Sequence, residues 1–187
     1  MNETLRFRSS AEFRKWLSAN HRKSEGIWLR IFKKDSREPT VTYAEALDEA
    51  LCFGWIDGQK QRGDDASWLQ RFTPRRSKSG WSKLNTQHAE RLINAGRMKP
   101  AGQAEIDAAK KDGRWKAAYD SPSKAALPKD FLAALEKSKK AKTFFESLNK
   151  ANRYAIAYRL QTAKKPETRQ RRMEMILAML RKGEAFH

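Results

Sequence analysis

The pattern of hydrophobic and polar positions differs between two parts of the chain: strands and helices are both indicated before about residue 80, and helices alone after it. In the first part, the run Ile27–Phe32 is apolar at nearly every position and predicts a central strand. Two alternating runs, Trp55–Arg62 and Ser67–Thr73, flank a Gly-Asp-Asp-Ala turn and predict a β-hairpin that ends at Pro74. On the first of these strands the side chains at odd positions share one face, including Asp57, Gln59 and Gln61.

Helix boundaries in this part are marked by capping residues. Ser9 with Glu12, and Thr42 with Glu45, have the spacing of capping boxes, so helices should begin directly after Ser9 and Thr42. Gly54 is placed to end the second helix in the left-handed conformation.

From about residue 80 the pattern is helical to the end. The spacing of apolar residues predicts helices at 85–95, 100–113, 128–137, 141–149, 152–163 and 167–182. The mixed stretch 119–125 has the composition of a linker. We therefore expect an α+β protein: a small antiparallel sheet with packed helices in residues 1–120, then a helical C-terminal module in 126–187 that packs on the first part.

The net charge of +18 is unevenly distributed. Residues 58–99 contain ten basic and three acidic side chains, and residues 137–182 contain fourteen and three, so these two segments hold +7 and +11. Segregated charge can produce a field that attracts polyanions. Two solvated faces pointing in different directions would have the same composition.

Composition also argues against several classes of protein, including disulfide-bonded, membrane-spanning and exported proteins. Cys52 is the single cysteine, which fits a reducing compartment. The apolar runs are shorter than the roughly 18 residues of a membrane span, and the N-terminus lacks the apolar core of a signal peptide, so we expect a cytoplasmic protein. The three histidines are dispersed and the glycines form no phosphate-binding loop, so neither a metal nor a cofactor is expected.

Two blocks of sequence resemble a known family. Glu45–Gly58 (EALDEALCFGWIDG), Arg71–Arg76 (RFTPRR) and the pair Trp81-Ser82 form the first block, and Ala163–Arg172 (AKKPETRQRR) forms the second. Together they resemble the YdeI/OmpD-associated family of bacterial proteins, over about residues 5–182. The resemblance implies a connection with bacteriocin protection and with an outer-membrane porin, and it brings no catalytic residue or cofactor.

One candidate pocket lies around the hairpin, with Trp55, Asp57, Trp68 and Arg71 as its lining. An apolar setting would raise the pKa of Asp57 and suit it to acid–base chemistry. Alternatively, Asp57 fixes the turn through backbone amides, or a neighbouring arginine neutralises it.

Candidate anion-binding residues fall in both basic segments: Arg75, Arg76, Lys78, Lys83, Arg169, Arg171 and Arg172. Trp68, Phe72 and Trp81 lie among the first of them, a pattern typical of surfaces that stack bases and neutralise phosphates. Aromatic residues at alternate strand positions can equally belong to the core.

These patterns favour a non-enzymatic bacterial stress or bacteriocin-protection protein that binds an anionic partner through residues 58–99 and 137–182. The partner would be nucleic acid bound non-specifically, or an acidic protein surface. Two alternatives stay open: an enzyme or small-ligand binder with a pocket around Asp57 and Arg71, and a protein–protein adaptor. The sequence does not predict the oligomeric state.

Overall fold

The computed structural model describes residues 3–121 and 125–187 and divides the chain into two compact units. Unit 1 comprises Met1–Ser79 and Asn85–Lys116, and unit 2 comprises Gly80–Leu84 and Ala117–His187. Of the predicted linker, residues 122–124 lie outside the described part.

Unit 1 is built on a four-stranded sheet with the order β1-β2-β4-β3. Its strands are β1 (Thr4–Arg6), β2 (Ile27–Phe32), β3 (Trp55–Arg62) and β4 (Ser67–Pro74). The predicted hairpin β3–β4 and the central position of β2 are confirmed. The sheet is mixed rather than purely antiparallel, because β1 pairs with β2 in parallel. The helix between these two strands makes the crossover that a parallel pair requires.

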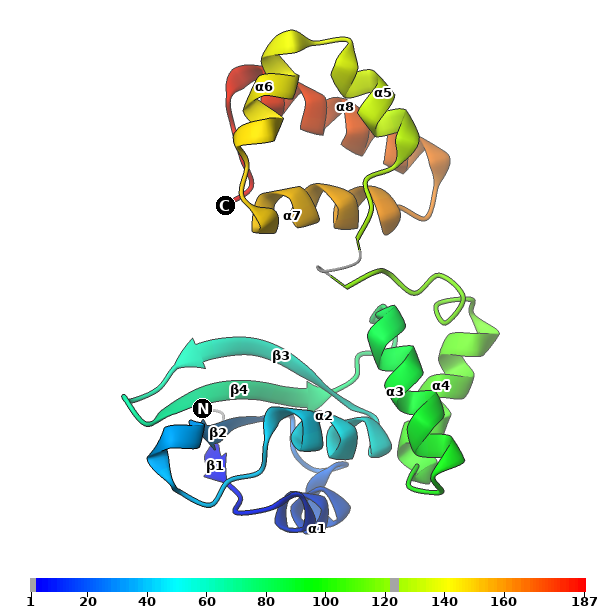
Figure 1. The fold of residues 1–187 in the computed structure, drawn as a ribbon. Coiled ribbons are helices and arrows are strands. Elements are labelled where there is room, and N and C mark those ends of the chain that lie inside the picture. The colour runs from blue at the N-terminus through cyan, green and yellow to red at the C-terminus, as the bar shows by residue number, and fades with distance from the viewer. Residues whose placement is uncertain (1–2, 122–124) are drawn as a thin grey trace. The chain divides into compact units, whose positions relative to one another are not determined.

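Helices α1 (Ser10–Asn20) and α2 (Tyr43–Cys52) lie on the same face of this sheet (Figure 1). Both begin where the capping residues predict. The Thr42–Glu45 box is complete, whereas Glu12 accepts from the backbone amide of Arg8 instead of that of Ser9. The apolar sides of α1 and α2 and the covered sheet face form the core of unit 1, which includes Phe13, Leu17, Leu29, Leu47 and Phe72.

Helix α4 approaches the end of α2 closely. Gly54 has φ 74° and ends α2 in the left-handed conformation, as predicted. A Cβ on Gly102 would lie 2.6 Å from the carbonyl oxygen of Leu51. The two helices can therefore touch only because residue 102 has no side chain. The other elements in the first 116 residues are the short 3-10 helix Lys34–Ser36, α3 (Lys83–Asn94), whose first two residues belong to unit 2, and α4 (Pro100–Lys111).

Unit 2 consists mainly of four helices, which confirms the predicted helical C-terminal region (Figure 1). They are α5 (Lys129–Glu136), α6 (Lys139–Ser147), α7 (Lys150–Gln161) and α8 (Pro166–Lys182). Their apolar sides enclose a separate core of Phe131, Leu135, Ala141, Phe145, Ile156, Leu160, Ile176, Leu177 and Leu180. None of the helices in the described ranges is long and apolar enough to cross a membrane.

Candidate functional site

The four residues of the predicted hairpin pocket are divided between the two faces of the sheet. Asp57 pairs with Phe72, and Trp68 pairs with Ile31, so Asp57 and Trp68 lie on the face that α1 and α2 cover. Arg71 is one position from Phe72 and points to the opposite face. The structure thus separates Arg71 from Asp57.

Trp55 is part of the packed core of unit 1. Its side chain is 1% exposed, and its indole nitrogen donates a hydrogen bond to the carbonyl oxygen of His21 at 3.0 Å. The ring also makes an edge-to-face contact with Trp16. The indole is fully occupied by protein contacts.

Asp57 is held by a side chain from α2. The hydroxyl of Tyr43 donates to Oδ2 of Asp57 at 2.7 Å. Burial and this carboxylate raise the pKa of Tyr43 above its ordinary value. Among residues 3–121 and 125–187, no basic side chain forms an ion pair with Asp57, and its bonding partner is a phenol rather than the expected turn amides.

Trp68 is half-buried beside Tyr43, with ring centroids 6.1 Å apart, and the amine of Lys60 lies 4.3 Å from the Trp68 ring centroid. Lys60 reaches this face because the register shifts between Asp57 and Lys60. The predicted face of Asp57, Gln59 and Gln61 is therefore wrong beyond the shift, where Lys60 and Arg62 take the positions opposite Gln70 and Trp68.

Arg71 extends across the face of the sheet opposite to α1 and α2. A Cβ on Gly58 would touch its aliphatic part at 3.4 Å, and one on Gly26 would lie 2.6 Å from its Nη2. Its guanidinium carbon lies 5.8 Å from the centroid of the Trp28 ring. Burial lowers the pKa of Arg71, and within the described residues its buried Nη1 makes no hydrogen bond.

The anion-binding candidates fall into two groups. Four of them make contacts within their own unit: Arg75 donates to Ser79, Lys83 pairs with Asp120, Arg169 pairs with Asp130, and Arg172 donates to the carbonyl oxygen of Arg159. The other three, Arg76, Lys78 and Arg171, are exposed and form no ion pair with any described residue. Phe72 and Trp81, proposed as stacking platforms, are at most 2% exposed and therefore belong to the packed interior.

A buried carboxylate lies between two arginines in unit 1. Glu49 on α2 accepts from Arg14 at 2.7 Å and from Arg97 at 2.6 Å. The adjacent Asp48 accepts from Arg91 and contacts His88. Burial alone would raise the pKa of Asp48, but these two partners hold it below its ordinary value. The cluster ties α2 to α1 and α3, and its charges are largely compensated internally.

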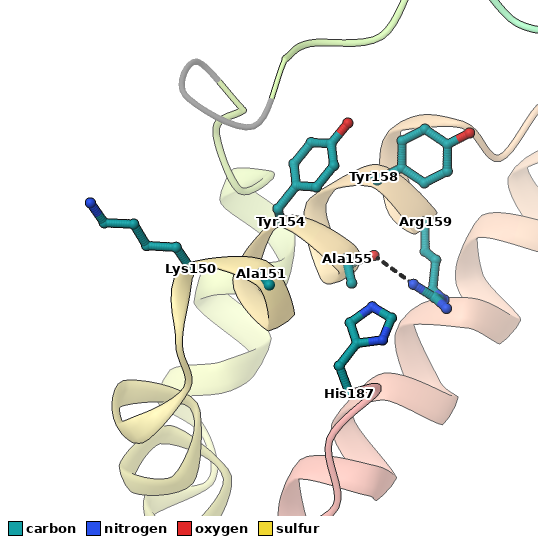
Figure 2. A pocket seen from close by; sticks show the side chains of 7 residues that line it. All are labelled: Lys150, Ala151, Tyr154, Ala155, Tyr158, Arg159 and His187. Carbon is teal, nitrogen blue, oxygen red and sulfur yellow. Dashed lines mark hydrogen bonds between the residues drawn. The ribbon is translucent and has the colours of Figure 1, made fainter. Parts of the chain in front are cut away.

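Unit 2 contains a hollow that the sequence patterns did not indicate. It has a volume of about 640 Å³ and is lined by Lys150, Ala151, Tyr154, Ala155, Tyr158, Arg159 and His187 (Figure 2). Six of the seven lie on consecutive turns of α7, at helical positions i, i+1, i+4, i+5, i+8 and i+9. This spacing is visible in the sequence, but the wall formed by His187 depends on the folded structure.

Comparison with known families gives one match in each of the two parts of the chain. Residues 5–105 match a family described as a domain of unknown function (DUF8412), which is more than half of the chain. The chain belongs to the DUF8412 family. The block of sequence around Gly54 and Asp57 lies within this DUF8412 segment, which also contains the sheet and α2.

Residues 124–183 match a second family, described as bacteriocin-protection, YdeI or OmpD-associated. The resemblance to that family is thereby confirmed, over the C-terminal segment rather than over 5–182. The DUF8412 segment and this second segment correspond closely to the two compact units. No curated protein and no solved structure matches the chain.

Proposed function

We propose that this protein is a non-catalytic, cytoplasmic binding protein of bacteriocin protection, and that unit 2 binds a phosphate-bearing polyanion. The match of residues 124–183 to the bacteriocin-protection family supports the first part. The charge of the same segment supports the second.

The observation that carries the proposal is the uncompensated charge of unit 2. Residues 137–182 contain fourteen basic side chains, and among the described residues only Lys142 and Arg169 of these form ion pairs. Lys137, Lys139 and Lys140 are exposed around the junction of α5 and α6. A surface of this kind attracts polyanions over the Debye length of about 8 Å at physiological salt.

Such binding would be independent of sequence. Lysine and arginine contacts to phosphates orient a nucleic acid without reading its bases, and the helices of unit 2 offer no recognised readout motif. The affinity would come largely from the release of condensed counterions. The hairpin pocket receives less support as an active site, since Arg71 and Asp57 lie on opposite faces of the sheet.

The test is a salt titration of binding by the full chain. Fluorescently labelled single-stranded and duplex oligonucleotides should bind with log affinity that falls linearly with log salt, by about 0.9 per neutralised phosphate for duplex DNA. Replacing Lys137, Lys139 and Lys140 together by glutamine should lower the affinity and reduce this slope by up to about 3. Fluorescence anisotropy measures both quantities.

A matched variant controls for net charge. Arg8, Lys15 and Lys23 are exposed in unit 1, and replacing them by glutamine removes the same three charges. If this variant loses as much affinity as the first, the binding reflects total charge and not unit 2. Affinity that does not change with salt, or a protein partner retained after nuclease treatment, would contradict the proposal.

A further inference from the structure

The hollow along α7 has the dimensions of a small-molecule site. Its volume of about 640 Å³ lies within the usual range of about 300–1,000 Å³ for ligand pockets. The space exists because residues 151 and 155 are alanines, whose short side chains leave room between the larger neighbours (Figure 2). A polyanion on the surface of unit 2 would not require a hollow of this kind.

Two tyrosines form part of the wall. Tyr154 and Tyr158 project from the same side of α7, and their ring centroids lie 5.9 Å apart (Figure 2). Tyr119 packs edge-to-face on Tyr158 at 5.0 Å, and the hydroxyl of Tyr154 donates to the carbonyl oxygen of Asp120 at 3.3 Å. These contacts orient both rings before any ligand is present, which lowers the entropy cost of binding.

The charged side chains of the lining are basic. Its seven lining residues include the cationic side chains of Lys150 and Arg159 and no acidic side chain. The guanidinium of Arg159 lies 3.8 Å from the Phe186 ring centroid and donates one hydrogen bond to the carbonyl oxygen of Ala155. Because a guanidinium has five N–H donors, Arg159 retains donors for a carboxylate.

The wall formed by the C-terminal residues is also held in place. Asn152 is 3% exposed, and its side chain hydrogen-bonds the backbone amides of Phe186 and His187 and the carbonyl oxygen of His187. Phe186 in turn supports the guanidinium of Arg159. The guanidinium of Arg159 is thus positioned by the Phe186 ring, and that ring by the buried amide of Asn152.

We propose that this hollow is a binding site for a planar aromatic anion. The aromatic ring lies over Ala151 and Ala155 against Tyr154 and Tyr158, and the negative group reaches Arg159. This inference does not rest on polyanion binding, since it concerns a different ligand and a different feature of unit 2.

The test uses naphthoate, an aromatic carboxylate, and naphthamide, its neutral counterpart, with the full chain. We expect naphthoate to bind at least about 10-fold more tightly than naphthamide, because a tenfold ratio corresponds to one good charged contact of about 1.4 kcal/mol. Calorimetry gives the affinities. Amide chemical shifts in a two-dimensional NMR spectrum should change around residues 150–159 and 186–187.

Three variants assign the site. Ala151→Leu fills the hollow at an exposed helical position and should abolish naphthoate binding without unfolding the helix. Arg159→Gln should lower naphthoate affinity about 10-fold or more and leave naphthamide unchanged. Lys139→Gln removes one charge from α6 in the same unit and should change neither affinity.

Several results would overturn the inference. Equal affinity for the two compounds would remove the role of Arg159, and naphthoate binding that survives Ala151→Leu would locate the ligand elsewhere. Failure to saturate at millimolar naphthoate would exclude the site for this class. The salt-dependent oligonucleotide assay should be unaffected by Ala151→Leu, so the two proposals fail independently.

Discussion

At the scale of single residues, unit 2 depends on a few polar side chains that join distant segments. Arg169 in the first turn of α8 forms two hydrogen bonds to Asp130 in the first turn of α5. Asn152 in α7 holds residues 186 and 187 through three hydrogen bonds. Removing either partner of such a contact affects the positions of whole elements.

The Asp130–Arg169 pair predicts a specific acid response. Hydrogen bonds from Arg169 lower the pKa of Asp130 to about 2. Because the folded-state pKa is below the unfolded value of about 3.9, the stabilisation is complete above about pH 4 and is lost as the pH falls toward 2. Arg169→Gln should return the pKa of Asp130 most of the way to its ordinary value, as an NMR titration of the carboxyl carbon would show.

Arg181→Gln provides the control for this titration. It removes one arginine from the last turn of the same helix, far in sequence from Asp130. An Asp130 pKa that stays near 2 in Arg169→Gln, or that rises equally in Arg181→Gln, would contradict the assignment.

At the scale of elements, the packing of α4 on α2 makes a glycine indispensable. Replacing an exposed glycine in a helix by alanine normally stabilises the protein by about 1 kcal/mol. At Gly102, however, the new Cβ would lie 2.6 Å from the carbonyl oxygen of Leu51. We therefore expect Gly102→Ala to lower the free energy of unfolding by about 1–3 kcal/mol, the range for overpacked sites.

Chemical denaturation followed by circular dichroism measures this change. Ala104 is exposed on the same helix, and Ala104→Gly should show the ordinary propensity loss of about 1 kcal/mol. A stabilising effect of Gly102→Ala would mean that α4 and α2 do not approach as closely as described.

Local signals in the sequence predicted most elements, because caps and periodicity depend on near neighbours. Thr42 with Glu45, Gly54 and the β3–β4 hairpin are confirmed in this way. The parallel pairing of β1 could not be predicted, since a three-residue strand has too short a pattern to define its partner.

The candidate site was harder to predict for the same physical reason. Whether Arg71 faces Asp57 depends on the register across the hairpin, and the shift after Asp57 alters that register. Gly58 lies within the shift, and a glycine inside a strand often marks a bulge, but it does not define which pairs result. One side of the hollow is a face of α7, and its helical spacing can be read from the sequence. The other side is formed by His187, which is hydrogen-bonded to Asn152, 35 positions earlier in the chain. Only the folded chain brings these two parts together.

At the scale of the whole molecule, the net charge of +18 predicts how stability responds to salt. Excess like charge destabilises a compact state by self-repulsion. Raising the ionic strength from about 0.01 to 0.1 M shortens the Debye length from about 30 to 10 Å. We expect the midpoint of thermal unfolding to rise by about 2–4 °C, which corresponds to roughly 1 kcal/mol for a protein of this size.

Scanning calorimetry across a salt series measures the effect. The variant with glutamine at 137, 139 and 140 carries less positive charge, so its midpoint should rise by a smaller amount. A midpoint that falls with added salt would show that exposed ion pairs outweigh repulsion in this molecule.

The irregular edge of the sheet affects how the protein behaves at high concentration. Strand β3 is an edge strand, and its outer half, residues 59–62, is exposed and carries Lys60 and Arg62 next to the register shift. Charged, distorted edges resist the addition of a strand from another molecule, and the opposite edge, β1, is only three residues long. We therefore expect the register shift in β3 to help protect this chain, which contains six tryptophans and nine phenylalanines, from fibril-like aggregation.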